Sequence, residues 1–124
     1  MNYRYYNPNP ITSTSGDCVV RMLCAITGRP WVDVYLSLAE KGIEMGDMMS
    51  ANRVWMAYLK DLGYKRHVIP NSCPDCYTIN DFCNDNPVGT YVVGTGSHVV
   101  CIRNGSFLDT WNSGEEPIFF YFSR

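Results

Sequence analysis

The sequence predicts an α+β fold in one domain over residues 1–124. Apolar residues in the first half recur at helical spacing, whereas the second half holds short runs rich in Val, Ile, Tyr and Phe that are typical of strands. Helices that precede the strands, rather than alternate with them, indicate N-terminal helices packed on a C-terminal, mainly antiparallel sheet. With 124 residues, 46% of them apolar, the chain is long enough to bury its own core.

Three helices are expected in the first half, after an irregular arm that contains one short extended piece. Each helix follows residues that favour a helix start, and each precedes a glycine, which readily adopts the left-handed conformation at a helix end. We expect Gly42 to stop the second helix and residues 43–49 to form a loop. The arm, its extended piece and the three helices are predicted over residues 1–16, 3–6, 17–28, 30–42 and 50–62.

The second half is expected to hold one short helix and five strands. Thr78, followed three residues later by Asp81, indicates a helix start, and the Asn-Pro pair at 86–87 ends that helix. Asn104-Gly105 is a strong signal for a tight hairpin, in which Arg103 faces Ser106. The strands are predicted over 64–69, 90–93, 97–103, 106–111 and 118–122, and the helix over 78–84.

Charge and composition limit the classes of function. The chain has 12 acidic and 10 basic residues, a net charge of −2, and no cluster of Lys and Arg that would attract a nucleic acid. No segment resembles a secretory signal peptide, and no run approaches the roughly 18 apolar residues that a membrane-spanning helix needs. We therefore expect a cytoplasmic protein with no nucleic-acid or membrane partner, whose thiols are reduced.

The six cysteines differ in their sequence surroundings. Cys18 lies in the first turn of the first predicted helix, where the positive end of the helix dipole lowers the pKa of a thiol. Cys24 and Cys101 lie within apolar stripes and are expected to be small core residues. Cys18 is therefore the candidate nucleophile.

A second group of cysteines has a spacing that could bind zinc. Cys73 and Cys76 form a C-x-x-C motif, and Cys83 with His67 could complete a four-ligand site. A second C-x-x-C motif is missing, and the usual outcome of such a segment is a simple turn with Cys83 on the buried face of its helix. We therefore predict neither a metal ion nor a cofactor.

A nucleophilic cysteine needs a base, and a further group to orient that base. His98 begins an apolar strand, whereas His67, the other histidine, is expected at a solvated strand edge. The hairpin register predicts that His98, Val100 and Asp109 share one face of the sheet. Asp109 is then the diagonal neighbour of His98, about 7–8 Å away at Cβ, which allows a carboxylate–imidazole contact.

This order of residues resembles the papain-like cysteine peptidase superfamily. The motifs are Gly16-Asp17-Cys18 at a helix start, Ser97-His98-Val99-Val100 on a strand, and Leu108-Asp109-Thr110-Trp111-Asn112 on the next strand. The Asp-Cys pair and the eleven-residue interval from His98 to Asp109 are most similar to the double-glycine leader peptidases. The chain as a whole also resembles a group of small, uncharacterised bacteriophage-encoded proteins.

The resemblance implies a papain-like fold and thiol-dependent hydrolysis or acyl transfer on a peptide, isopeptide or other amide, with a peptide or protein as substrate. Cys18 would be the nucleophile and His98 the general base and then acid. Asp109 would orient His98, and Asn112 is the other candidate for that role because papains use an asparagine. Deamidation by the same three residues is a further outcome that the resemblance allows.

The chain departs from the family at the oxyanion hole, where the family has a glutamine five or six residues before the nucleophile. Thr12 and Ser13 stand there, and the chain has no glutamine at all. The Cys18 N–H could be one donor, and the candidates for a second are Thr12, Thr14, Asn7 and Asn9. Loss of one donor typically costs about 100- to 1000-fold in rate. The alternative is therefore a non-catalytic binding protein on the same scaffold, such as a phage protein that engages a host protein.

Overall fold

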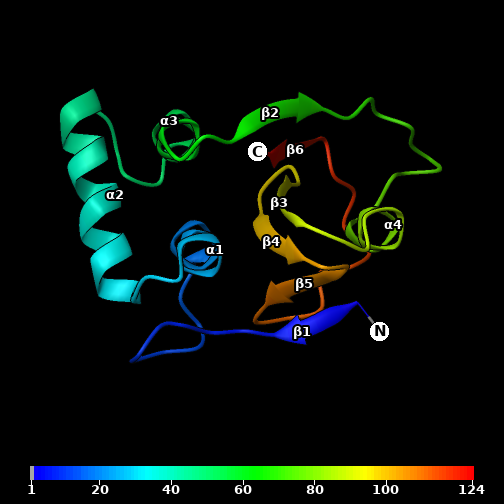
Figure 1. Ribbon diagram of the computed structural model, residues 1–124, viewed down its shortest axis with the longest axis horizontal. Helices are drawn as coiled ribbons and strands as arrows, with labels where there is room; N and C mark the ends of the chain where they lie inside the picture. Colours follow the sequence, from blue (N-terminus) through cyan, green and yellow to red (C-terminus); the bar gives the residue numbers. More distant parts are fainter. Residues whose placement is uncertain (1) are drawn as a thin grey trace.

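Figure 1 shows a computed structural model of the chain, which describes residues 2–124. These residues form an α+β fold with four helices and one six-stranded sheet. The elements, in chain order, are β1 (Tyr3–Tyr5), α1 (Cys18–Thr27), α2 (Trp31–Met45), α3 (Asn52–Asp61), β2 (Lys65–Val68), α4 (Ile79–Asp85), β3 (Thr90–Gly94), β4 (Val99–Arg103), β5 (Ser106–Asp109) and β6 (Phe120–Ser123).

The sheet has the strand order β1-β5-β4-β3-β6-β2. The predicted hairpin register is confirmed, because Arg103 pairs with Ser106 across the β4–β5 turn. Four of the five strand pairings are antiparallel, but β1 lies parallel to β5, with Tyr3 opposite Phe107. The sheet is therefore mixed, and the extended piece of the arm is one of its edge strands rather than an isolated segment.

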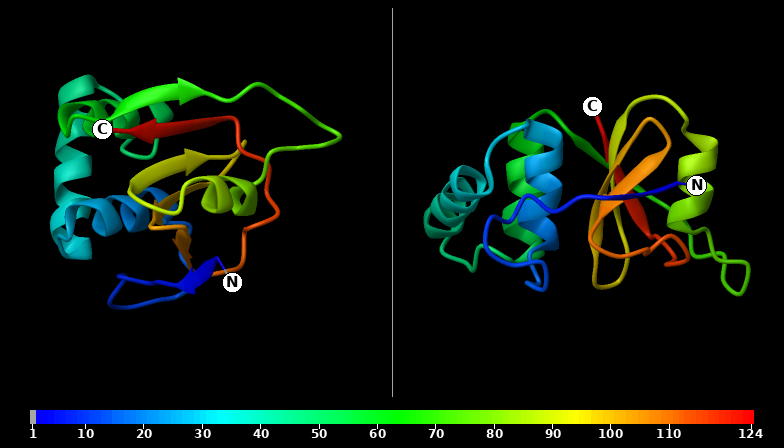
Figure 2. Two further views of the ribbon diagram at one scale, coloured as in Figure 1. Left: turned by 45° about the vertical axis from the view of Figure 1, so that its right-hand side comes forward. Right: turned by 90° about the horizontal axis from the view of Figure 1, so that it is seen from below.

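Helices cover both faces of the sheet. Helices α1, α2 and α3 lie on one side and α4 lies on the other, as the right-hand view of Figure 2 shows. Alternate residues of β4 face opposite layers: Val99 and Cys101 pack with the three N-terminal helices, whereas Val100 and Ile102 pack with α4. The expected burial of Cys24 and Cys101 is confirmed, at 1% and 0% exposure.

The predicted end of the second helix is wrong. Helix α2 continues through Gly42 to Met45 and ends at Gly46, which has the left-handed φ of 69°. Gly42 is buried, and a Cβ there would lie 2.8 Å from the Asp47 carbonyl oxygen and 3.2 Å from the Met49 amide nitrogen. The glycine therefore lets the following turn pack against the helix instead of ending it.

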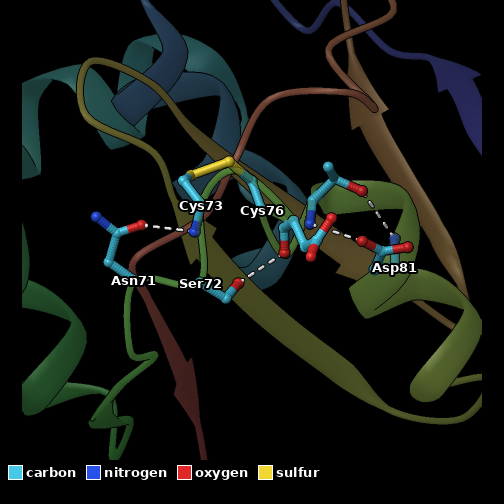
Figure 3. The surroundings of a disulfide bond; sticks show 7 residues. Asn71, Ser72, Cys73, Cys76 and Asp81 are labelled. Atoms are coloured by element: carbon cyan, nitrogen blue, oxygen red, sulfur yellow. Dashed lines mark hydrogen bonds between the residues drawn. A yellow bond between two sulfur atoms is a disulfide. The ribbon is translucent and has the colours of Figure 1, made fainter.

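Figure 3 shows a disulfide bond between Cys73 and Cys76 in the loop before α4. The prediction that all thiols are reduced is wrong for this pair, because the turn brings the two Cα atoms within 4.1 Å. Cys18, Cys24 and Cys83 are free thiols, as is Cys101.

The disulfide also removes two ligands from the zinc site that the cysteine spacing suggested. Cys83 is a buried residue of α4, and the Nε2 atom of His67 contacts the Ser123 hydroxyl at 2.9 Å. Within residues 2–124, no group of three or more His, Cys, Asp and Glu side chains could hold a metal ion. No helix of this part of the chain is long and apolar enough to cross a membrane.

Candidate active site

The first residue of α1 is Cys18, whose side chain is half-buried. Asp17 precedes it at the N-cap position, but the Asp17 carboxylate does not cap the helix. The carboxylate accepts hydrogen bonds from Arg21 at 3.3 Å, from the Trp31 indole at 2.8 Å and from Asn9 at 3.2 Å. The N–H groups in the first turn of α1 therefore remain available to a negative charge at Cys18.

The candidate base, His98, lies just before β4 and after a tight turn in which Thr95 N–H donates to the His98 carbonyl at 2.8 Å. Its imidazole Nε2–H donates to Asp109 Oδ2 at 2.6 Å, and the ring lines the same two clefts as Cys18. The prediction that Val100 shares its face is wrong. Because His98 precedes the regular strand, its ring reaches α1, whereas Val100 packs towards α4.

Asp109 ends β5 and is fully buried. Its Oδ2 accepts hydrogen bonds from His98 and from the Ser113 hydroxyl at 2.7 Å. Its Oδ1 accepts from Arg21 at 3.2 Å and from the Thr110 N–H at 2.8 Å. These four donors fix the carboxylate in one orientation, which holds the imidazole in turn.

The other candidate for the orienting role lies elsewhere. Asn112 is exposed, and its side-chain oxygen accepts from the Gly114 N–H at 3.2 Å. Of the two candidates, Asp109 is the one in contact with His98.

The three groups shift one another's pKa values. Burial by itself raises the pKa of the Cys18 thiol, but hydrogen bonds from His98 and from the Val99 N–H outweigh it, and the pKa is lowered. Burial by itself lowers the pKa of His98, but the hydrogen bonds to Asp109 and Cys18 outweigh it and raise the pKa to about 9. A lowered thiol pKa beside a raised imidazole pKa favours a thiolate–imidazolium pair at neutral pH.

The pKa of Asp109 is likewise set by burial against hydrogen bonds. Burial raises the pKa of the Asp109 carboxyl, but hydrogen bonds from His98 and Ser113 outweigh it, and the pKa is lowered. The carboxylate therefore stays ionised beside the imidazolium.

The sequence prediction missed two residues of this cluster, Arg21 and Ser113. Arg21 is 5% exposed and joins Asp17 to Asp109 through its two terminal nitrogens. A signal for it exists in the sequence, since Arg21 is the one charged residue in the apolar segment 18–27 and follows Asp17 by four residues. Ser113 lies in a loop, and no local pattern distinguishes it from other serines.

Two clefts meet at the cysteine and the histidine. Cys18, His98, Gly16 and Ser97 line both of them. The smaller cleft, about 190 Å³, combines apolar side chains, from Val19, Trp55, Val99 and Phe120, with polar ones, from Ser50, Asn52 and Thr95. The larger, about 470 Å³, has many hydroxyl groups, from Ser13, Thr14, Ser15 and Thr110, with Trp111 beside them. A chain that lay through both clefts would therefore pass directly over Cys18 and His98.

The structure shows which of the predicted oxyanion donors already have other hydrogen-bond partners. The amide groups of Asn7 and Asn9 already donate to the Thr12 carbonyl at 3.2 Å and to Asp17 at 3.2 Å. Thr14 lines the larger cleft with Cys18, and its hydroxyl contacts the Thr12 hydroxyl at 3.0 Å. The Cys18 N–H and the Thr14 hydroxyl are therefore the best placed of the predicted donors.

The cluster therefore combines a thiol of lowered pKa with an imidazole held by a carboxylate, next to uncapped backbone N–H groups and two clefts. Comparison of the chain with protein-family models, with curated proteins and with solved structures finds no match.

Proposed function

We propose that this protein is a papain-like, thiol-dependent hydrolase or acyltransferase that acts on a peptide, isopeptide or other amide. The observation that carries the proposal is the 2.6 Å hydrogen bond that holds His98 on Asp109, with the imidazole and the Cys18 thiol lining the same two clefts. The lowered thiol pKa and the position at a helix start support the assignment of Cys18 as nucleophile.

In the first half of the reaction, the Cys18 thiolate attacks the carbonyl carbon of the amide and forms the new C–S bond. The negative charge that develops on the carbonyl oxygen accepts a hydrogen bond from the Cys18 N–H. The His98 imidazolium then gives its proton to the amide nitrogen, the C–N bond breaks, and an amine leaves a thioester on Cys18.

In the second half, neutral His98 takes a proton from water, and the hydroxide attacks the thioester carbonyl. The C–S bond breaks, the carboxylic acid leaves, and the thiolate–imidazolium pair is restored. An amine in place of water gives acyl transfer, and a primary amide substrate, which releases ammonia, gives deamidation. Asp109 holds the imidazole in orientation throughout and stabilises its charged form.

The first test is the reactivity of the thiol. Iodoacetamide should alkylate Cys18 faster than any other cysteine, with an apparent pKa below about 8.5. Buried Cys83, whose pKa burial raises to about 11, is the internal comparison. A His98→Gln variant should shift the pKa of the Cys18 thiol upwards, because the main hydrogen bond to the thiolate is lost. The catalytic assignment fails if Cys18 reacts no faster than Cys83.

A second test detects the acyl intermediate without knowledge of the natural substrate. Incubation with p-nitrophenyl acetate should release p-nitrophenolate in a burst and add one acetyl group to Cys18, seen by mass spectrometry. Cys18→Ser should show no acylation at this position, and Asp109→Asn should slow the burst. Absence of an acyl adduct on the native protein would count against acyl chemistry.

The competing function is a non-catalytic binding protein on the same scaffold. The observation in its favour is a row of exposed apolar side chains on the outer face of α2, which includes Val32, Leu36 and Ile43 at 51%, 56% and 81% exposure. This function predicts no acyl adduct on Cys18, so the p-nitrophenyl acetate experiment separates the two functions.

A further inference from the structure

A cavity of about 370 Å³ lies apart from the candidate active site, beside the β4–β5 turn and the β1 edge of the sheet. It shares no lining residue with either cleft at Cys18. Its lining consists of two arginines, an amide, two hydroxyl-bearing residues and one leucine: Arg4, Arg103, Asn104, Tyr6, Ser106 and Leu108. The volume lies within the range of small-molecule sites.

The charge of this cavity differs from that of the chain. The chain has a net charge of −2, yet the cavity is lined by two arginines and by no acidic residue. Within residues 2–124 the ion pairs involve Arg21, Lys41, Arg53 and His98, so neither Arg4 nor Arg103 has a carboxylate within 4.0 Å. Two guanidinium groups without a counter-charge make a local positive field, which attracts an anion.

The two arginines come from different parts of the fold. Arg4 is in the middle of β1, opposite Leu108 of β5, and Arg103 ends β4. Arg103 is held in place because one terminal nitrogen donates to the Ala25 carbonyl of α1, while its other N–H groups remain available. The cavity therefore has one anchored guanidinium, which a ligand can bind at a low cost in side-chain entropy.

We propose that this cavity binds a small phosphomonoester, with its phosphate between Arg4 and Arg103 and its organic part against Tyr6 and Leu108. A phosphate monoester is close to a dianion at neutral pH and matches the charge of two guanidinium groups, each of which can form paired hydrogen bonds with phosphate oxygens. The Ser106 hydroxyl supplies a further polar group. The tyrosine ring and the leucine give an apolar wall, which favours an organic phosphate over free phosphate.

The test is a titration of the full chain with phenyl phosphate, followed by the backbone amide signals of Arg4, Ser106 and Leu108 in NMR spectra. We expect a saturable shift of these signals with a dissociation constant in the millimolar range or below. Arg4→Gln and Arg103→Gln should each weaken binding by about tenfold or more, because each removes a charge-assisted contact. The exposed Lys60→Gln variant makes the same charge change elsewhere and should leave the affinity unaltered.

Two comparison ligands test whether both the phosphate and the organic part of phenyl phosphate are needed for binding. Inorganic phosphate should bind more weakly than phenyl phosphate, and phenol should give no saturable shift. The proposal is overturned if phenyl phosphate gives no saturable shift, if both arginine variants bind as the native protein does, or if inorganic phosphate binds equally well. Cys18→Ser should bind phenyl phosphate normally, so this result is independent of the proposed catalytic function.

Discussion

Arg21 of α1 donates a hydrogen bond from Nη1 to Oδ1 of Asp109 at 3.2 Å, and both side chains are buried. This contact joins the helix that begins with Cys18 to the end of the strand whose carboxylate holds His98. Arg21 thereby links the two halves of the candidate site, and within residues 2–124 its guanidinium bonds to Asp17 and Asp109 rather than to the Cys18 thiol. It is a positioning residue in the proposed mechanism.

Replacement of Arg21 by methionine should destabilise the protein strongly. The substitution leaves the buried carboxylates of Asp17 and Asp109 without their shared cation, and loss of one partner of a buried ion pair costs about 3–5 kcal/mol. Urea denaturation measures the change. Arg53→Met removes an exposed ion pair with Asp47 and should cost no more than about 1 kcal/mol. Equal losses in the two variants would contradict the role of Arg21.

Asp109→Asn should lower the pKa of His98. The hydrogen bond to the carboxylate is the largest of the effects that raise this pKa to about 9, and without it burial draws the pKa back towards or below the ordinary 6.5. NMR titration of the imidazole ring measures the shift. Asn112→Ala should leave the titration unchanged, because Asn112 is exposed and bonds to Gly114. A larger response to Asn112→Ala than to Asp109→Asn would reverse the assignment.

The stability of the fold should depend on pH through His98. Its pKa is raised on folding, so the imidazolium stabilises the protein fully below about pH 6.5, and this stabilisation is lost as the pH rises through about 9. The experiment uses Cys18→Ser, which removes the coupled thiol and retains the hydrogen bond to Asp109. Urea midpoints of this variant should fall with rising pH more steeply than those of Cys18→Ser/His98→Gln. If the urea midpoints of the two variants changed with pH in parallel, the pKa of His98 would not be raised on folding.

Gly94→Ala should disturb the smaller cleft. A Cβ at Gly94 would collide with the ring of Phe120, which lines that cleft and packs beside Trp55. Insertion of a methyl group into such a contact costs about 1–3 kcal/mol, and we expect slower alkylation of Cys18 as Phe120 moves. Gly96→Ala is the matched control, because a Cβ there meets no atom within 4 Å. The free energy of unfolding of the Gly96→Ala variant should change by no more than about 0.5 kcal/mol.

Local patterns predicted most of the fold because the features involved are local. Thr78 and Asp81 form the expected reciprocal hydrogen bonds at the start of α4, at 3.2 Å and 3.0 Å. The Asn104-Gly105 turn has the positive φ angles that this dipeptide favours, 49° and 77°, and it set the register of its hairpin. The pairing of β1 with β5 joins segments about a hundred residues apart, and no local pattern encodes it.

The candidate site was predictable only in part, for a related reason. The helix-start position of Cys18 follows from local sequence. The contact of His98 with Asp109 was expected from strand register, but His98 lies just before β4 and does not share the face of Val100. The buried link through Arg21 depends on how α1 packs on the sheet, which periodicity does not specify. The disulfide between Cys73 and Cys76 was missed because the sequence argument assigned one redox state to every cysteine.

The backbone of the N-terminal arm is tied to the candidate site, since the Tyr6 N–H donates to the Asp109 carbonyl at 2.9 Å where β1 lies beside β5. The proposed nucleophile is thus made early during synthesis, whereas the histidine, the carboxylate and the partner strand of β1 are made late. A nascent chain that has emerged only as far as α3 holds Cys18 without its base, so its thiol keeps an ordinary reactivity. In the proposed mechanism, the order of synthesis therefore delays activation of the thiol until Asp109 has left the ribosome and the sheet can close around it.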